Sequence, residues 1–211
     1  MKSCLGIVLA ALAVASLGGC AAVTKEQCVA GDWADLGNAH ASVGKPADHL
    51  DEVVKSCGKH GITPDTRAYL SGWNQGLQNY CTPLNGFTLG KQNKQRSSIC
   101  PPQMANGFNQ AYQLGNVIWK ANDRVSQAES KILSLENTVD ALNDKLHDTK
   151  CKDKKKDDLK DCRRKRRRLR DDLSDAEYDL DAARYDLDDV RAEAEFVSAS
   201  INVEAARLFA W

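Results

Sequence analysis

The sequence lacks several features that would point to common classes of protein. Only 6% of its 211 residues are aromatic, and the positive and negative charges cancel to a formal net charge of zero. No stretch alternates apolar and polar residues for long enough to predict a β-strand, which favours an all-α fold. No serine lies in a nucleophile-elbow context and no glycine-rich phosphate loop follows a strand, so the common hydrolase and nucleotide-binding motifs are missing.

The longest apolar run is short and lies near the N-terminus, from Leu5 to Leu17. A transmembrane helix needs about 20 apolar residues, so this run has the length of a signal-peptide core instead. It follows Lys2 and leads into the sequence LGGC at residues 17–20. We therefore expect residues 1–19 to be a signal peptide that is removed on export.

The sequence LGGC resembles the lipobox of bacterial lipoproteins. The resemblance implies that Cys20 is acylated, for example with palmitate, and that residues 20–27 form the lipidated N-terminus and a short linker. Ala21 follows this cysteine, and by resemblance to lipoprotein sorting this implies a cell-envelope protein on the periplasmic side of the outer membrane. The alternative is an ordinary secretory signal, with Cys20 as a disulfide partner.

Six cysteines remain after the signal and Cys20 are set aside, and an even number in an exported chain predicts disulfides. Six cysteines allow about 15 pairings, so the sequence does not fix the connectivity. Pairs that are neighbours in sequence close three short loops at the lowest entropic cost. We therefore expect Cys28–Cys57, Cys81–Cys100 and Cys151–Cys162.

Residues 28–115 are rich in Gly, Asn, Cys and aromatic side chains and predict a small disulfide-bound helical head. Thr63-Pro64-Asp65 is a helix start signal, since a hydroxyl cap, a first-turn proline and an acid follow one another. Gly72 and Gly76 lie four residues apart, on one helix face, and predict close helix packing. The sequence TPLNG at residues 82–86 predicts a turn, because Asn-Gly accepts positive backbone dihedrals.

Four segments of this head resemble a bacterial lipoprotein family that is known as a domain of unknown function, over roughly residues 28–120. The segments are GDW at 31–33, the spaced pattern from Cys57 to Asp65, YLSGWNQGLQNYCTPLNGF at 69–87, and CPPQMANGFNQAYQLG at 100–115. The resemblance implies a shared small fold and a place in the cell envelope. It implies no activity, substrate or catalytic residue.

The head contains residues that could form three kinds of site. Trp33, Trp73 and Tyr80 could form an aromatic groove for a ligand, glycan or peptide, although aromatic residues in a small domain are first of all core. Cys57 and His60 have the spacing of metal ligands, but an oxidised cysteine cannot bind zinc. Paired carboxylates of a hydrolase could come from five acids, which we otherwise expect to be helix caps or solvated charges: Asp32, Asp35, Asp48, Asp51 and Asp65.

Residues 116–211 predict a long antiparallel two-helix coiled-coil hairpin. Two series of apolar residues repeat at alternating spacings of three and four, which is typical of a coiled-coil seam. The first series is Ala128, Ile132, Leu135, Val139, Leu142 and Leu146. The second is Leu169, Leu173, Ala176, Leu180, Ala183, Leu187, Val190, Ala194, Val197 and Ile201.

The sequence between the two series favours a hairpin over one continuous rod. Cys151 and Cys162 would lie about 16 Å apart along a helix, too far for a disulfide, whereas a turn brings them together. With a turn centred near Lys156, Leu146 is expected to face Arg166, and Ile118 to face Ala194. The alternative is a rod that oligomerises and forms disulfides between chains.

The predicted tip, residues 150–170, carries roughly nine net positive charges, whereas residues 171–189 carry roughly eight net negative ones. Both blocks are consistent with solvated faces, but arginines on adjacent turns also suit bidentate binding of phosphate or carboxylate groups. The predicted anion-binding residues are Arg163, Arg164, Arg166, Arg167 and Arg168.

The sequence as a whole favours a non-enzymatic structural or interaction lipoprotein of the cell envelope that presents this basic tip to an anionic envelope polymer or an acidic protein. Self-association is a further possibility, and nucleic acid is not expected as a partner of an exported chain. No cofactor or metal is expected. The alternatives are a ligand-, glycan- or peptide-binding module in the aromatic head and, less favoured, an envelope hydrolase.

Overall fold

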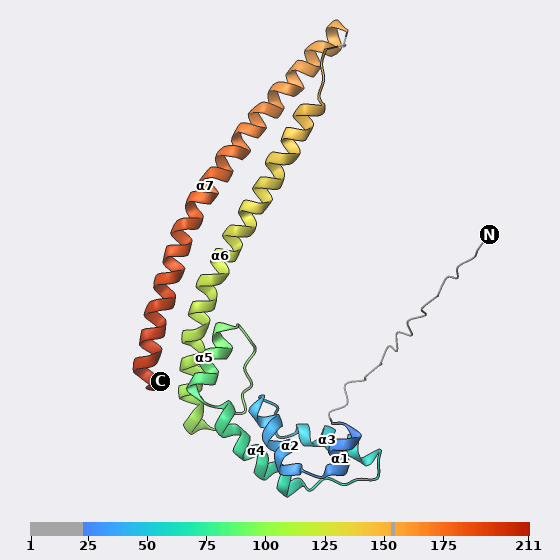
Figure 1. The fold of residues 1–211 in the computed structure, drawn as a ribbon, viewed down its shortest axis with the longest axis vertical. Coiled ribbons are helices and arrows are strands. Elements are labelled where there is room, and N and C mark those ends of the chain that lie inside the picture. Colours follow the sequence, from blue (N-terminus) through green and yellow to red (C-terminus); the bar gives the residue numbers. More distant parts are fainter. Residues whose placement is uncertain (1–22, 153–154) are drawn as a thin grey trace, which may run out of the picture. The chain divides into compact units, whose positions relative to one another are not determined.

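The computed structural model describes residues 23–152 and 155–211, and every element of secondary structure in them is an α-helix (Figure 1). The signal peptide and Cys20 lie outside the described residues. The described chain divides into two compact units after Gly76, within α4, whereas the sequence suggested a boundary near residue 115. None of the described helices is both long enough and apolar enough to cross a bilayer.

The first unit contains short helices around one disulfide. Cys28 and Cys57 are joined, with their Cα atoms 5.4 Å apart, and both are buried beside Val53 and Tyr69. Trp33 packs into the same cluster. Its helices are α1 (Lys25–Ala30), α2 (Trp33–Ser42), α3 (His49–Gly58) and most of α4 (Thr66–Tyr80).

Glycines bring the backbones of α2 and α4 into direct contact. A Cβ atom added at Gly72 would overlap the carbonyl oxygen of Ala34, and one at Gly37 would overlap that of Tyr69. Gly76 makes an equivalent contact one turn further along α4. The close packing that the sequence predicted for Gly72 and Gly76 is therefore confirmed, and any side chain there would force the helices apart.

Within the second unit, a helix begins where the sequence predicted a turn. Residues 82–86 start α5 (Pro83–Lys91), because the Thr82 hydroxyl accepts the N–H of Asn85 and Pro83 occupies the first helical position. The turn prediction was wrong because the cap and proline together outweigh the Asn-Gly signal. Cys81 is joined to Cys100, which closes the loop after α5.

Glycines also mediate the packing of α5 against α6 (Pro102–Asp148). A Cβ atom at Gly86 would overlap the carbonyl oxygen of Phe108, and one at Gly115 would overlap that of Phe87. Gly90 lies equally close to the backbone of α6. The C-terminal end of the chain joins this region, where Phe87 packs with the residues Ala111, Ile118, Ala205, Leu114, Ile201 and Phe209.

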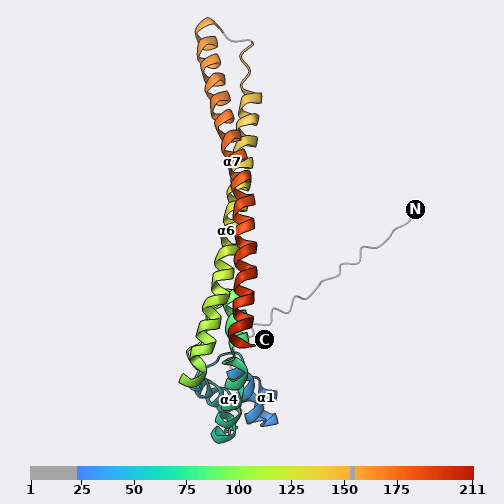
Figure 2. The same ribbon diagram turned by 90° about the vertical axis from the view of Figure 1, so that its left-hand side faces the viewer.

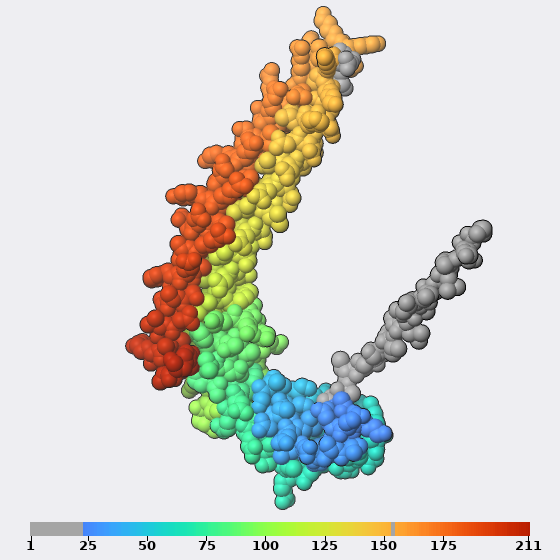
Figure 3. Space-filling model, viewed as in Figure 1, coloured from blue at the N-terminus to red at the C-terminus, as the bar shows by residue number. Residues whose placement is uncertain are grey.

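The remainder of the second unit is the predicted antiparallel hairpin of α6 and α7 (Lys156–Phe209). The helices contain 47 and 54 residues, and they run side by side in Figures 1 and 2. The predicted seam residues are buried or half-buried, while the positions between them are exposed, apart from the half-buried Glu136 and Ser198. In the space-filling view, atoms of α6 and α7 lie against each other along much of the hairpin (Figure 3).

Candidate functional site

The tip of the hairpin is asymmetric. α6 ends at Asp148, but the first turns of α7 continue beyond that point (Figures 1 and 2). Cys151, three residues after the end of α6, is joined to Cys162, so the residues of α7 that precede Cys162 lie beyond the end of α6. The beginning of α7 therefore has no α6 beside it.

This asymmetry shifts the register of the hairpin. Arg124 of α6 pairs with Glu193 of α7 at 2.9 Å. Ile118, which lies six residues before Arg124, was the residue expected to face this part of α7, at Ala194. Ile118 packs with Ala205 instead. The pairing of Ile118 with Ala194 was wrong because it assumed a turn that is equally long on both sides.

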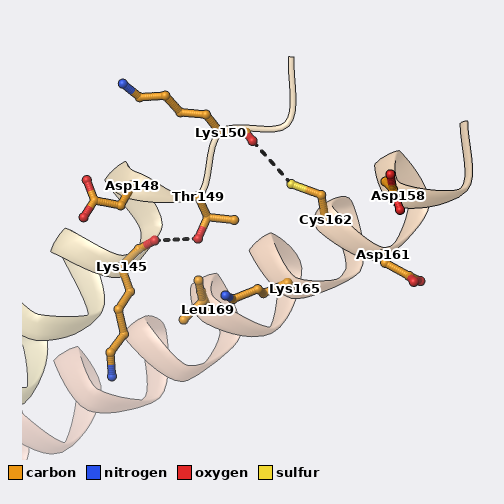
Figure 4. Close-up of a pocket in the computed structure, with 9 residues that line it drawn as sticks. All are labelled: Lys145, Asp148, Thr149, Lys150, Asp158, Asp161, Cys162, Lys165 and Leu169. Atoms are coloured by element: carbon orange, nitrogen blue, oxygen red, sulfur yellow. Dashed lines mark hydrogen bonds between the residues drawn. The ribbon is translucent and has the colours of Figure 1, made fainter. Parts of the chain in front are cut away.

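A disulfide attaches the connecting segment to the overhanging part of α7. Cys151 and Cys162 are joined, with their Cα atoms 5.8 Å apart, and Cys162 is buried. The sulfur of Cys162 also lies 3.7 Å from the carbonyl oxygen of Lys150 (Figure 4). An oxidised sulfur carries no proton, so this is a packing contact and not a hydrogen bond. The disulfide holds a segment that has no helical partner of its own.

Arg166 has a structural role at the tip. It occupies the seam position between Cys162 and Leu169, and it is half-buried. Its Nη1 atom donates to the carbonyl oxygens of Leu146 and Thr149, at 3.2 and 2.8 Å. These carbonyls lie at the C-terminal end of α6, where helical partners are missing and positive charge is favourable. The guanidinium of Arg166 is therefore engaged within the chain.

The other four predicted anion-binding arginines are exposed on α7: Arg163, Arg164, Arg167 and Arg168. Arg164 forms an ion pair with Asp161 on the preceding turn. Among the described residues, the remaining three make no ion pair within the chain. Guanidinium groups in this arrangement can bind carboxylate or phosphate oxygens through paired N–H donors.

An open pocket of about 680 Å³ lies between the end of α6 and α7. Its lining carries mixed charge, from the residues Lys145, Asp148, Thr149, Lys150, Asp158, Asp161, Cys162, Lys165 and Leu169. In Figure 4 the three lysine ammonium groups point in different directions and do not converge. The lysines of this pocket therefore do not form one positive site, and the predicted anion-binding arginines that are exposed lie on α7 outside the pocket lining.

The acidic block beside the tip receives little neutralisation from α6. The ion pairs between the helices use the arginines of α7, since Arg184 binds Glu136 at 2.9 Å and Arg191 binds Glu129 at 2.8 Å. Within the block, Asp181 lies 3.7 Å from Arg184. The other acids of residues 171–189 make no ion pair with any described residue.

The aromatic residues proposed for a groove in the head are held in packing contacts. Trp33 is buried, and the Nε1–H of Trp73 donates to the carbonyl oxygen of Lys45 at 2.9 Å. Tyr80 is buried against Phe108, and its hydroxyl accepts the backbone N–H of Ser97. Tyr80 also belongs to the second unit, whereas both tryptophans belong to the first. The structure therefore assigns each ring to a core.

The structure does not assemble the suggested metal or carboxylate sites. Cys57 is buried in its disulfide and His60 is exposed. No cluster of His, Cys, Asp or Glu in the described parts of the chain could hold a metal ion. Asp65 caps α4 by accepting the N–H of Ala68. Asp32 and Asp35 line a small open pocket of about 250 Å³, and the remaining two carboxylates are exposed.

A buried polar pair in the first unit was not predicted. His40 Nδ1 lies 2.8 Å from the hydroxyl of Tyr69, and both side chains are buried. Burial, followed by the nearby charges of His49 and Lys45, lowers the pKa of His40 to about 4. Burial raises the pKa of Tyr69 to about 12. Both groups are therefore neutral at pH 7, so the pair satisfies two buried polar groups.

The polar pair continues to the protein surface through His49. The rings of His40 and His49 meet edge to face, 4.6 Å apart. Lys45 Nζ lies 2.9 Å from His49 Nε2, and His49 Nδ1 lies 2.9 Å from a carboxylate oxygen of Glu52. The sequence could not reveal this cluster, because Tyr69 is distant in sequence from His40.

Comparison with known families supports part of the resemblance that was noted from the sequence. Residues 32–117 match the model of a family described as protein of unknown function DUF2799. The match includes all the glycines that pack α2 against α4 and α5 against α6, and it ends before the coiled-coil seam. No curated protein and no solved structure shows significant similarity to the chain.

Proposed function

We propose that this chain is a non-enzymatic interaction lipoprotein of the bacterial cell envelope, anchored through Cys20, whose hairpin tip binds an anionic envelope component. The observation that carries the proposal is the group of exposed arginines on the overhanging part of α7. Three of them make no ion pair with any described residue, so they are available to a partner. The disulfide and Arg166 hold the surface that presents them.

The anionic component is defined by the chemistry of the tip. Guanidinium groups bind phosphate and carboxylate in a bidentate geometry, and both groups occur in the cell envelope on glycolipids and on peptide stems. Binding through exposed charges weakens as salt screens them, with a Debye length of about 8 Å at physiological ionic strength. The proposal therefore requires binding that decreases with salt.

The test is co-sedimentation of the processed full chain with purified envelope fractions across a salt series. The tip variant replaces Arg163, Arg164, Arg167 and Arg168 with Gln and retains Arg166, because Arg166 supports the end of α6. We expect this variant to keep its helical circular dichroism and to lose salt-sensitive sedimentation. Sedimentation equal to wild type at low salt would contradict the proposal.

A matched control removes four exposed positive charges away from the tip, by replacing Lys55, Lys59, Lys120 and Lys131 with Gln. This control should sediment like wild type, which separates the tip from total charge. The anchor has its own test, since Cys20→Ser should release the protein from membranes or leave it unprocessed. Unchanged processing and membrane fractionation in that variant would remove the lipoprotein part of the proposal.

A further inference from the structure

The face of α7 that points away from α6 changes sign along its length. Near the tip it carries a basic segment, defined here as Lys160, Arg164, Arg167 and Arg168. The same face then carries an acidic segment, defined as Asp171, Asp175, Tyr178, Asp181, Tyr185, Asp188 and Asp189. All these residues lie between the buried seam positions and are exposed. The two segments are adjacent on one rigid helix, so neither can fold back onto the other.

Two tyrosines lie within the acidic segment without a packing partner in α6. Tyr178 and Tyr185 are 76% and 73% exposed, and they lie seven residues apart, about two helical turns, on one face. A guanidinium group can cover such a ring, as Arg96 does over Tyr112 elsewhere in the chain, at 5.0 Å from the ring centre. The acidic segment thus offers carboxylates and aromatic faces together, and both bind arginine.

We propose that α7 binds α7 of a second copy of this chain in an antiparallel arrangement, with the basic segment of each copy against the acidic segment of the other. This inference rests on the proposed function, because it names the partner of the same arginines. The two segments are centred about 15 residues apart, or about 22 Å along the helix. A two-fold axis between them makes both contacts equivalent and satisfies both at once.

The charges exclude the other simple arrangement. Two parallel α7 helices in register would place basic on basic and acidic on acidic segments, which is repulsive at both contacts. A soluble polyanion would bind the basic segment alone and would be repelled by the acidic segment beside it. A second copy covers the arginines, the acids and both tyrosines, so it accounts for the whole outer face.

The test is sedimentation velocity of the processed full chain in density-matched detergent, with two charge-reversal variants. The tip-reversed variant carries Arg164→Glu, Arg167→Glu and Arg168→Glu. The shaft-reversed variant reverses three charges of the acidic segment, by Asp175→Lys, Asp181→Lys and Asp188→Lys. We expect wild type to form a salt-sensitive dimer, and each variant alone to associate at least about tenfold more weakly, because like charges then face each other.

An equal mixture of the two variants should restore the dimer, because opposite charges then meet at both contacts. The acidic tip of the tip-reversed chain meets the basic shaft of its partner, and the basic tip of that partner meets the unchanged acidic segment. A photo-reactive amino acid at position 178 should cross-link to residues 160–168 of the second copy. A wild type that stays monomeric at low salt, a mixture that stays monomeric, or cross-links to the region around position 178 of the second copy would overturn the proposal.

The shaft-reversed variant separates this inference from the proposed function. It retains every arginine of the tip and loses acidic repulsion beside them, so it should bind envelope fractions at least as strongly as wild type even though its self-association is lost. Wild-type protein that sediments with the envelope but remains monomeric would leave the proposed function standing and reject the second copy. Wild-type protein that dimerises but does not bind the envelope would support the second copy as the partner and reject binding to an envelope component.

Discussion

The short helices and the long hairpin pack by different means. In the helix pairs α2–α4 and α5–α6, glycines place backbone against backbone, so a single added methyl group has no space. In the hairpin, Leu and Ala side chains meet along a seam, and charged residues occupy the positions around it. The first kind of contact specifies individual residues, whereas the second specifies a pattern. The difference explains why the family match can cover the glycine-packed helices and end before the seam begins.

The largest expected effect tests the glycine contacts. Gly72→Ala should lower the free energy of unfolding by about 3 kcal/mol, because the new Cβ would overlap the backbone of α2. The measurement is urea denaturation followed by circular dichroism. The matched control is Gly58→Ala, since Gly58 is also helical but a Cβ there meets nothing within 4 Å. Equal stability of both variants would show that the close contact is not a constraint.

A smaller effect is expected in the pH dependence of stability, which should differ between the two units. The folded pKa of His40 is about 4, below its ordinary value of 6.5, so the unfolded chain binds a proton that the folded chain does not. This contribution to stability is complete above pH 6.5 and is lost as pH falls toward 4, by up to about 1.4 kcal/mol per pH unit.

The measurement for His40 is urea denaturation at pH 7 and pH 5. The variant His40→Gln should flatten the pH dependence, while His60→Gln, which changes an exposed histidine, should not. As the pH falls, amide hydrogen exchange should become faster first in the first unit and not in the hairpin. An unaltered pH dependence in His40→Gln would assign the effect to other groups.

The smallest effect is expected in the hairpin. Arg184→Gln and Arg191→Gln remove two ion pairs between α6 and α7, both about half exposed. Each should cost less than about 1 kcal/mol, because exposed pairs are solvated and screened. Thermal unfolding at low and high salt measures this, and the difference from wild type should shrink as salt is added. A loss as large as that of Gly72→Ala would break the distinction between the two kinds of packing.

The sequence predicted the helical class, the hairpin and the paired cysteines because each depends on spacing along the chain. The seam repeats every three or four residues, and neighbouring cysteines close the shortest loops. Arg166 was mistaken for a surface group, because an arginine at a seam position is not recognised by an apolar pattern. Its partners are backbone carbonyls at the end of α6, which no side-chain pattern reveals.

The remaining differences have similar causes. Residues 82–86 begin a helix because the Thr82 hydroxyl caps it and Pro83 occupies its first position, and the Asn-Gly signal alone does not reveal this. The register of the hairpin depends on how far α7 extends beyond the end of α6, and no apolar spacing in the sequence reveals that length. The contact between His40 and Tyr69 joins two helices across the first unit, and composition carries no record of it.

The overhang of α7 also sets a rule for insertions and deletions at the tip. A residue in an extended conformation advances about twice as far as a residue in a helix, so one extended residue added after α6 matches about two residues added to α7. Seven residues added to α7 between Cys162 and Arg166 would keep both residues on the seam face, but they would need about three more extended residues between Thr149 and Cys151. The disulfide thus couples the length of the segment after α6 to the length of the overhanging part of α7, and only matched insertions in both can extend the tip.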